Sequence, residues 1–366
     1  MIAKWKFQRE VDRLATQAKA LPLMLYEPFV QRRYDAAREH TITFTEGAIT
    51  ASSRLAIFLI FQPKGLSLSI LSSCRFLKQA GFAPLIVSNT PLSDRDRSAL
   101  SEVSYLIVER PNFGYDFGGY RDGVWVMNSR GLTPNEVLFL NDSVWFPILP
   151  QTALLEEMRE LPEPYVGTQV FGDITLPGNT RGFFGSYCFL IKKPVWDSKS
   201  FQDFWSTYRV SSNKEVTLRR GERNFSRQLL SDGFGATGVF SLARFQSLID
   251  TLSPEALREA VRDMVVTAPG LVAKQESLVK ADLDNAHPDV LRDLIIASAQ
   301  SKNYIAAAPV LSVRELGFPM IKKNMERHYV IARHRILRAI DEGRLTGFDP
   351  TVVEEIRLAS NNAGDS

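Results

Sequence analysis

Cysteine and long hydrophobic runs are both scarce in this sequence, and each shortage excludes a class of protein. The 366 residues include only Cys74 and Cys188, far apart and each inside an apolar segment, which fits buried free thiols in a reducing cytoplasm better than a disulfide framework. No stretch approaches the roughly 18 apolar residues of a membrane span, and the N-terminus lacks the apolar centre of a secretory signal. We expect a cytoplasmic protein, either soluble or peripheral on the inner face of the plasma membrane.

An excess of one charge is also missing. The 44 basic and 41 acidic side chains leave a formal charge of +3, so the sequence predicts no nucleic-acid partner. The histidines, His40, His287, His328 and His334, have no metal-ligand spacing with cysteine or carboxylates. His328 and His334 belong to a predicted basic helix over Lys322 to Arg338. A solvated face is the simpler interpretation, and contact with anionic lipid is the alternative.

Two nucleotide-binding motifs are absent. No Gly-x-x-x-x-Gly-Lys-Ser/Thr loop is present, which disfavours a phosphoryl-transferring enzyme. A nicotinamide or flavin fold places Gly-x-Gly-x-x-Gly directly after its first strand. Here only Gly65 follows the first predicted strand, and the glycine cluster at 114, 118 and 119 comes after the third.

From Arg54 onward, apolar runs alternate with helical spacing. The runs of strand length are Leu55–Phe61, Pro84–Val87 and Tyr105–Val108. The segments with helical spacing are Leu66–Ala80 and Ser93–Ser101. This βαβαβ order predicts a parallel sheet with right-handed crossovers. The three strand ends bring Gln62, Asn89 and Asn112 to one edge of that sheet, where we expect a ligand.

A fourth apolar run, Val137 to Leu140, stops abruptly at Asn141-Asp142-Ser143. Open α/β sheets bind ligands in the crevice at the carboxyl ends of their strands. The stretch around this run therefore predicts a ligand site, and our working hypothesis is that it holds a nucleotide-sugar and a metal ion. The composition further predicts three units: an N-terminal helical segment over 1–50, an α/β domain over 51–250, and a helical C-terminal region over 251–366.

Several strings resemble the rhamnan-synthesis protein F family of bacterial polysaccharide glycosyltransferases. The most specific are NFGYDFG and the NDS of LFLNDSVWFP. They are accompanied, in order from about Arg54 to Met325, by RLAIFLIFQPKG, GSYCFLIKKPV, GERNFSRQLLSDGFG and ELGFPMIKKNM. The resemblance implies a GT-A-like fold, with a Rossmann-type mixed sheet flanked by helices. It also implies a nucleotide-sugar donor, for which dTDP-rhamnose is the candidate, and a glycan or lipid-linked oligosaccharide acceptor, as in lipopolysaccharide O-antigen.

The resemblance also places a metal motif. GT-A enzymes carry Asp-x-Asp after a central strand, where its carboxylates hold Mg²⁺ or Mn²⁺ against the donor phosphates. Here the place reads Asn141-Asp142-Ser143, with one carboxylate instead of two. Asp142 is the predicted single ligand of a divalent cation. Alternatively, the triplet bonds the ribose or the sugar, or forms a turn stabilised by its own backbone.

The glycine-rich turn before this strand is the second predicted part of the site. Asn112 and Gly114 resemble residues that precede the metal strand in related transferases, and glycine lets backbone amides approach a ligand. Asp116 is then expected to face sugar hydroxyls, and Arg121 the phosphate, with Asp122 also directed to the donor. The alternative is a helix N-terminus with Asp116 as its cap.

An inverting transfer needs a carboxylate base on the acceptor side. Glu222 is the first choice because it lies at a glycine-preceded helix start, and Asp173 is the rival. Neighbouring arginines would lower the basicity of Glu222 if they approached it, or would bind pyrophosphate, the role predicted for Arg220. Glu222 as a plain helix cap is the alternative.

The sequence therefore predicts an inverting glycosyltransferase that adds a deoxyhexose such as rhamnose to a surface polysaccharide precursor. The alternative is a glycan-binding or nucleotide-sugar-binding protein that kept the fold and lost catalysis. The missing second carboxylate favours that alternative.

Overall fold

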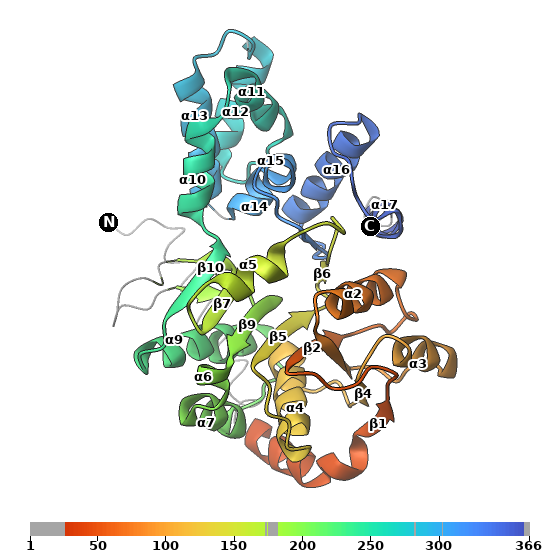
Figure 1. Cartoon of the computed structure of the whole chain (residues 1–366). Helices are drawn as coiled ribbons and strands as arrows, with labels where there is room; N and C mark the ends of the chain where they lie inside the picture. The colour runs from red at the N-terminus through yellow and green to blue at the C-terminus, as the bar shows by residue number, and fades with distance from the viewer. Residues whose placement is uncertain (1–25, 173, 175–181, 282, 302, 362–366) are drawn as a thin grey trace.

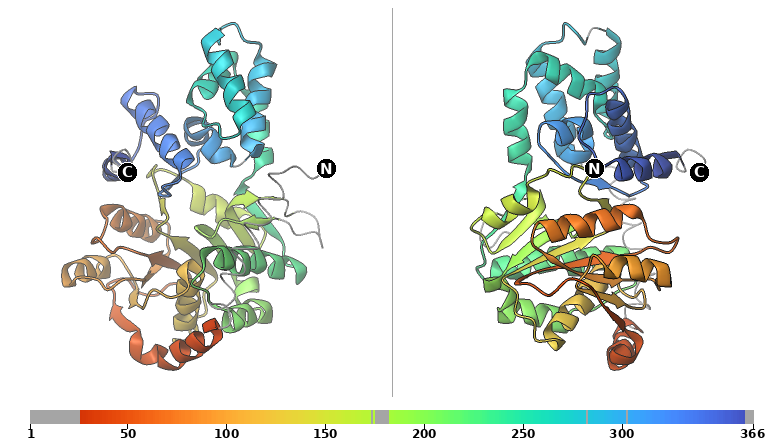
Figure 2. Two further views of the ribbon diagram at one scale, coloured as in Figure 1. Left: turned by 180° about the vertical axis from the view of Figure 1, so that it is seen from behind. Right: turned by 45° about the vertical axis from the view of Figure 1, so that its right-hand side comes forward.

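A computed structural model describes residues 26–172, 174, 182–281, 283–301 and 303–361 of the chain. In Figure 1 a twisted sheet occupies the lower part of the molecule, and a group of helices from the C-terminal part stands above it. The described part of the N-terminal segment is helical over 26–41 and lies at the opposite end from those helices (Figures 1 and 2).

The strands form a nine-stranded sheet and a small two-stranded one. They are β1 Thr43–Glu46, β2 Arg54–Ile60, β3 Ala83–Ser88, β4 Leu106–Glu109, β5 Glu136–Asn141, β6 Val144–Trp145, β7 Tyr165–Phe171, β8 Phe183–Phe184, β9 Cys188–Lys192, β10 Ala236–Phe240 and β11 Ile321–Lys322.

The helices fall before, between and after these strands. They are α2 Leu68–Gln79, α3 Asp94–Ser101, α4 Tyr115–Ser129, α5 Leu154–Glu160, α6 Lys193–Trp196, α7 Lys199–Thr207, α8 Lys214–Leu218, the π-helical η1 Arg219–Arg223, α9 Asn224–Ser231, α10 Leu242–Thr251, α11 Pro254–Asp263, α12 Pro269–Ala281, α13 Pro288–Ser301, α14 Tyr304–Ala307, α15 Pro309–Arg314, α16 Arg327–Asp341 and α17 Pro350–Asn361.

The large sheet is mixed. Its order is β1-β4-β3-β2-β5-β9-β7-β10, and β8 pairs with β7. Strands β4, β3, β2 and β5 run parallel, as the βαβαβ pattern predicts. Strands β1 and β9 run antiparallel to their neighbours β4 and β5. The predicted α/β class, with a mixed sheet flanked by helices, is confirmed. In the register of β2 with β5, Leu59 lies opposite Asn141, so both strands end at the same edge.

The two faces of the sheet bury different residues, because successive side chains of a strand point to opposite sides. On β2, Phe58 packs with the core cluster that includes Cys74 of α2, whereas Ile57 packs with Phe117 of α4. Both cysteines are free and buried, as predicted.

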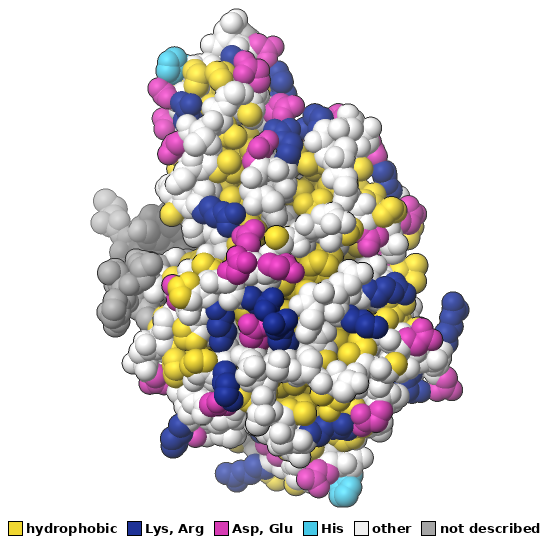
Figure 3. All heavy atoms as spheres, viewed as in Figure 1, with side chains coloured by type: hydrophobic (Ala, Val, Ile, Leu, Met, Phe, Trp, Pro, Cys, Tyr) yellow, Lys and Arg dark blue, Asp and Glu magenta, His cyan; other side chains and the backbone are white. Residues whose placement is uncertain are grey.

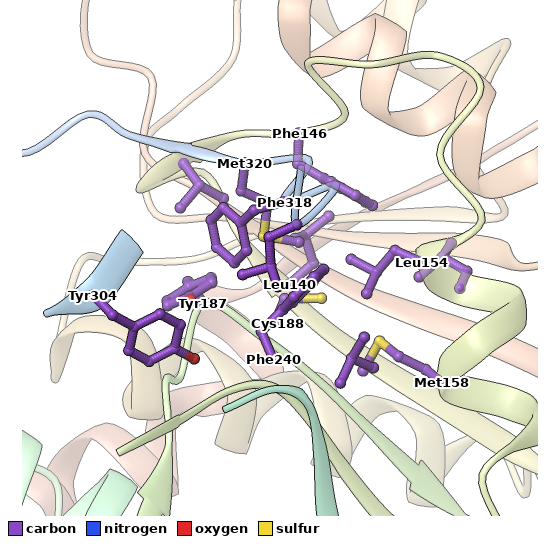
Figure 4. Packing of buried hydrophobic residues seen from close by; sticks show 14 of the residues in the cluster. Leu140, Phe146, Leu154, Met158, Tyr187, Cys188, Phe240, Tyr304, Phe318 and Met320 are labelled. Atoms are coloured by element: carbon purple, nitrogen blue, oxygen red, sulfur yellow. The ribbon is translucent and has the colours of Figure 1, made fainter. Parts of the chain in front are cut away.

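The core on the α2 side continues from the sheet into the helical region. Figure 4 shows Leu140 and Cys188 of the sheet, Phe240 at the end of β10, and Tyr304, Phe318 and Met320 from the C-terminal part in one cluster. After the helical region the chain returns to the sheet. There β11 pairs antiparallel with β6, the short strand that follows β5 in the sequence. The division into units at 50 and 250 stays a prediction.

Charge and hydrophobicity on the surface agree with the composition. Figure 3 shows acidic and basic side chains interspersed over one face. None of the helices that the structure describes is long and apolar enough to cross a membrane. The expectation of a solvated basic face on α16 is wrong for two of its residues. His328 is buried, and Arg333 is fully buried, with its guanidinium donating to the carbonyl oxygens of Lys322 and Asn324.

Candidate active site

The site begins where β5 ends, at the triplet Asn141-Asp142-Ser143. The Asn141 side chain accepts hydrogen bonds from the Ser143 backbone N–H at 3.1 Å and from the Ser143 hydroxyl at 2.6 Å. Its amide Nδ2 donates to the Asp116 carboxylate at 3.0 Å. The predicted self-bonded turn therefore forms, and it also fixes a carboxylate of a different element.

Asp142 is anchored to the loop that follows β2. Its Oδ2 accepts from the Phe61 backbone N–H at 2.7 Å and from Gln62 Nε2 at 2.6 Å. Burial raises the pKa of Asp142, while Lys323 and these hydrogen bonds oppose the rise. The structure brings the predicted residues Gln62 and Asp142 together, with one oxygen of the carboxylate already bonded to protein.

The glycine-rich turn leads into α4. Gly114 is the N-cap residue, with φ of 87°, and a Cβ there would lie 1.9 Å from Val210 Cγ1. Only glycine fits both the left-handed backbone and this close approach. Asp116 thus lies in the first turn of α4 and is not the cap. Its carboxylate points to Asn141, and Asn112 is exposed on the preceding loop.

Glu222 lies inside a helix and not at a helix start, which corrects the sequence prediction. The segments α8, η1 and α9 follow each other without a break, and Glu222 belongs to the π-helical turn η1. Gly221 is required by packing, because a Cβ there would lie 2.4 Å from the Phe117 ring. The wide turn directs Glu222 back toward the sheet, where its Oε1 accepts from the Ser186 backbone N–H at 2.7 Å. The helix-cap alternative for Glu222 is therefore wrong.

Asp116 and Glu222 influence each other electrostatically. Burial raises the pKa of Asp116 to about 6, and the charges of Glu222 and Asp142 add to the rise. Lys322 and Lys214 oppose it. A carboxyl group with a pKa near 6 can exchange a proton close to neutral pH.

Lys322 and Lys323 are the residues that sequence reasoning missed. They occur in the family string ELGFPMIKKNM and at the start of the predicted basic helix, but the structure ends β11 at Lys322 and begins α16 at Arg327. Lys322 ends β11, and its Nζ lies 3.6 Å from the centroid of the Tyr187 ring. Burial lowers the pKa of Lys322 to about 8, although the charges of Glu222 and Asp116 act in the opposite direction. Lys323 Nζ lies 5.3 Å from the Trp145 ring, and Asp142 interacts with its charge.

Three predicted donor-binding residues make structural contacts instead. Both terminal nitrogens of Arg121 donate to Asp35 of helix 26–41, at 2.6 and 2.8 Å. Arg220 pairs with Glu27 at 3.2 Å. Asn89 accepts from Arg110 Nη1 at 2.6 Å, which ties the end of β3 to the loop before α4.

Asp122, which was also expected to face the donor, makes a structural contact instead. It is fully buried and pairs with Arg110 at 2.5 Å. Asp173, the rival base, lies outside the described residues.

The residues around Asp142 offer the predicted Mg²⁺ or Mn²⁺ a single carboxylate. Mg²⁺ is usually bound by one or two carboxylates together with substrate phosphates and waters. Here Asn141 Oδ1 and Asp142 Oδ2 each already accept two hydrogen bonds. Within the described ranges, no group of three or more histidine, cysteine, aspartate or glutamate side chains is placed to hold a metal ion. The triplet is therefore a hydrogen-bonded turn that offers one carboxylate as a possible metal ligand.

Comparison with solved structures gives partial overlaps with glycosyltransferases. The glycosyltransferase GlyE of Streptococcus pneumoniae TIGR4 is 13% identical with a TM-score of 0.33, and 55% of this chain covers 48% of it. A mannosyltransferase of Pyrobaculum calidifontis, in complex with GDP-Man and Mn²⁺, is 11% identical with a TM-score of 0.31, and 88% of this chain covers 97% of it. The chain thus spans about half the length of GlyE. These scores are too low to transfer a site.

Sequence comparison is more informative. An uncharacterised protein of Sinorhizobium fredii, y4gN, is 30% identical over 97% of this chain and 92% of its own length. The family model of rhamnan synthesis protein F matches residues 85–282, which include the turn before α4, the triplet after β5 and Glu222. The membership that the NFGYDFG and NDS strings predict is confirmed, and this chain belongs to the rhamnan synthesis protein F family.

Proposed function

We propose that this chain is a glycosyltransferase that moves a sugar from a nucleotide-diphosphate donor to a polysaccharide precursor. The observation that carries the proposal is the set of side chains held at the carboxyl end of β5 in a member of the rhamnan synthesis protein F family: Asp116 by Asn141, Glu222 by the Ser186 backbone N–H, and Lys322 against the Tyr187 ring. Open α/β sheets bind their ligands at this edge. The family name supports rhamnose or another deoxyhexose as the sugar, with dTDP-rhamnose as the donor to test first.

The reaction needs two charged functions. The bond between the sugar C1 and the diphosphate oxygen breaks, and its electron pair leaves on the diphosphate. A new bond forms between C1 and the acceptor hydroxyl oxygen, whose proton passes to a carboxylate base. A base on the acceptor side, opposite the leaving group, corresponds to inversion at C1. Asp116, Glu222 and the neighbouring lysines supply both kinds of charge.

Glu222 remains the proposed base, and Asp116 is now the second candidate. Glu222 is partly exposed and is oriented by one backbone hydrogen bond, so an oxygen of its carboxylate stays available for an acceptor hydroxyl. Asp116 is favoured by its pKa of about 6, since a base works best when its pKa is close to the working pH. If Glu222 is the base, Asp116 binds sugar hydroxyls, as the sequence predicts.

The remaining donor contacts are proposed around these carboxylates. Asn141 and Gln62 hold the turn and the loop that border the donor, and Asn112 is exposed on the rim. Arg121 and Arg220 are no longer proposed as phosphate ligands, because Asp35 and Glu27 occupy their guanidinium groups.

The test is donor turnover by the purified full-length chain. A panel of nucleotide-sugars that includes dTDP-rhamnose is incubated with and without Mg²⁺ or Mn²⁺, and released nucleoside diphosphate is measured by chromatography. Slow hydrolysis of one donor that falls at least 100-fold, on the order of a lost general base, in Glu222→Gln supports the proposal. Binding of a donor without turnover, unchanged by Glu222→Gln, would support the non-catalytic nucleotide-sugar-binding protein instead.

A further inference from the structure

Two adjacent lysines at the site, Lys322 and Lys323, form no salt bridge within 4.0 Å in the described part of the chain. The charges of Glu222, Asp116 and Lys214 act on Lys322 through electrostatics beyond salt-bridge distance. Its closest partner is the face of the Tyr187 ring, at 3.6 Å.

The backbone, and not an ion pair, holds these lysines in place. Lys322 lies opposite Val144 in the β11–β6 pairing, directly after the Asn141-Asp142-Ser143 triplet. The Lys323 backbone N–H donates to the Ser143 carbonyl oxygen at 2.8 Å. From the other side, fully buried Arg333 donates to the carbonyl oxygen of Lys322 at 3.1 Å. The fold therefore fixes Lys322 next to the triplet without satisfying its charge.

Keeping an unpaired ammonium group in a partly buried site costs free energy. The Tyr187 ring offsets only part of that cost, since a cation–π contact is worth less than a hydrogen-bonded ion pair. Successive residues of a strand also face opposite sides, so Lys322 is directed to Tyr187 and Lys323 to Trp145. Lys322 is thus the ammonium group that shares the space of Asp116 and Glu222.

We propose that Lys322 binds the diphosphate of the donor and stabilises its charge as it leaves, beside Asp116 and Glu222. The chemistry needs one compact positive charge with several N–H donors beside the reacting carboxylates, and a lysine ammonium supplies it. Asp142 then serves to hold the loop after β2 against the triplet, which is what its two hydrogen bonds do. This inference rests on the proposed function, because it assigns the phosphate subsite of the same donor.

The test measures binding of dTDP, UDP and GDP, and of the matching nucleosides, by calorimetry in EDTA. The wild-type chain is expected to bind one nucleoside diphosphate more tightly than its nucleoside. Lys322→Gln is expected to weaken binding of the diphosphate by roughly ten- to a hundredfold, because one charge-assisted contact is lost. The affinity for the nucleoside should not change. Lys322→Arg should recover part of the loss. Lys199→Gln, on the exposed end of α7, is the matched control and should bind as wild type.

The possible results distinguish the proposed role of Lys322 from the proposed glycosyltransferase function. If the wild-type chain turns over a donor but Lys322→Gln binds the diphosphate normally, the inference is wrong and the proposed function stands. An equal loss for the nucleoside would also overturn it, since that would mean general damage to the site. The inference would also be overturned if the wild-type chain lost its affinity for the diphosphate in EDTA and regained it with Mg²⁺. If the wild-type chain neither binds nor turns over any donor, the proposed function itself fails.

Discussion

Asn141 donates its side-chain N–H to the Asp116 carboxylate at 3.0 Å, and this bond joins the end of β5 to the first turn of α4. The two residues are 25 positions apart and belong one to each of the two motifs that mark the family resemblance. Because Asn141 is 2% exposed, water cannot replace the bond easily. The bond sets the direction of the carboxylate that the mechanism needs.

Replacing Asn141 by alanine should reduce both stability and activity. The expected loss is about 1–3 kcal/mol in the free energy of unfolding, measured by urea denaturation, because Asp116 loses a buried donor. Asn128→Ala is the control, since the Asn128 side chain makes a hydrogen bond of 2.8 Å to Gln202 on an exposed surface. A loss in the control as large as in Asn141→Ala would contradict the role of the buried bond.

The pKa of Asp116 predicts a dependence of activity on pH. If Asp116 acts as the base, kcat/KM for donor turnover should rise with pH through about 6 and then level off. Asp116→Asn should abolish the activity. If Glu222 is the base instead, Asp116→Asn should keep measurable activity but lose the limb near pH 6. A wild-type profile that is flat between pH 5 and 7 would exclude Asp116 as the titrating group.

The same pKa predicts the opposite trend for stability. Asp116 has a folded-state pKa of about 6 against an ordinary value of 3.8, so the folded state favours the protonated form. Its contribution is fully present below pH 3.8 and is lost as the pH rises through 6. Asp116→Asn should therefore be more stable than wild type at pH 8 by roughly 1–2 kcal/mol and show no gain at pH 4. Denaturation curves at both pH values decide this.

Much of the sheet and part of the site could be predicted because their signals are local. The strands β2, β3 and β5 are continuous apolar runs, and the stop at Asn141 marks the end of one of them. The family resemblance and the close backbone approach that glycine permits predict Gly114, and the structure shows it at a positive φ. The structure brings Gln62, Asp116, Asn141 and Asp142 together at the predicted edge.

The wrong site predictions concern the orientation of side chains on helices and the pairing of segments that are far apart in the sequence. Asp116 and Arg121 are five residues apart on α4, which turns them about 140° from each other, so both cannot face one ligand. Gly221 resembled a helix start because glycine is unfavourable inside helices, but the Phe117 ring requires it there. Lys322 reaches the site through a pairing of two residues with β6, which is too short to leave a periodic pattern in the sequence.

The buried pair of Arg110 and Asp122 should be essential for folding and not for chemistry. Arg110 is 4% exposed and also donates to Asn89 and to the Phe113 carbonyl oxygen, both at 2.6 Å. Arg110→Ala removes the guanidinium that pairs with buried Asp122 and leaves the Tyr34 hydroxyl as its donor at 2.5 Å, and a loss of about 3–5 kcal/mol in unfolding free energy is expected. Arg97→Ala, which removes a more exposed pair with Glu109, should cost much less. Thermal unfolding of both variants provides the measurement.

The pKa of Lys322 predicts that diphosphate binding weakens at high pH. A lysine with a pKa of about 8 loses its charge as the pH rises through 8, whereas an ordinary lysine does so near 10.5. Asp116, Glu222 and Lys214 set this value together with burial, and the Tyr187 ring faces the ammonium group. The Kd of the nucleoside diphosphate should thus increase roughly tenfold from pH 7 to pH 9 in wild type, because the charged fraction falls about that much. Lys322→Arg should bind with nearly constant Kd over the same range, since arginine stays charged. An equal increase in both proteins would show that another group is titrating.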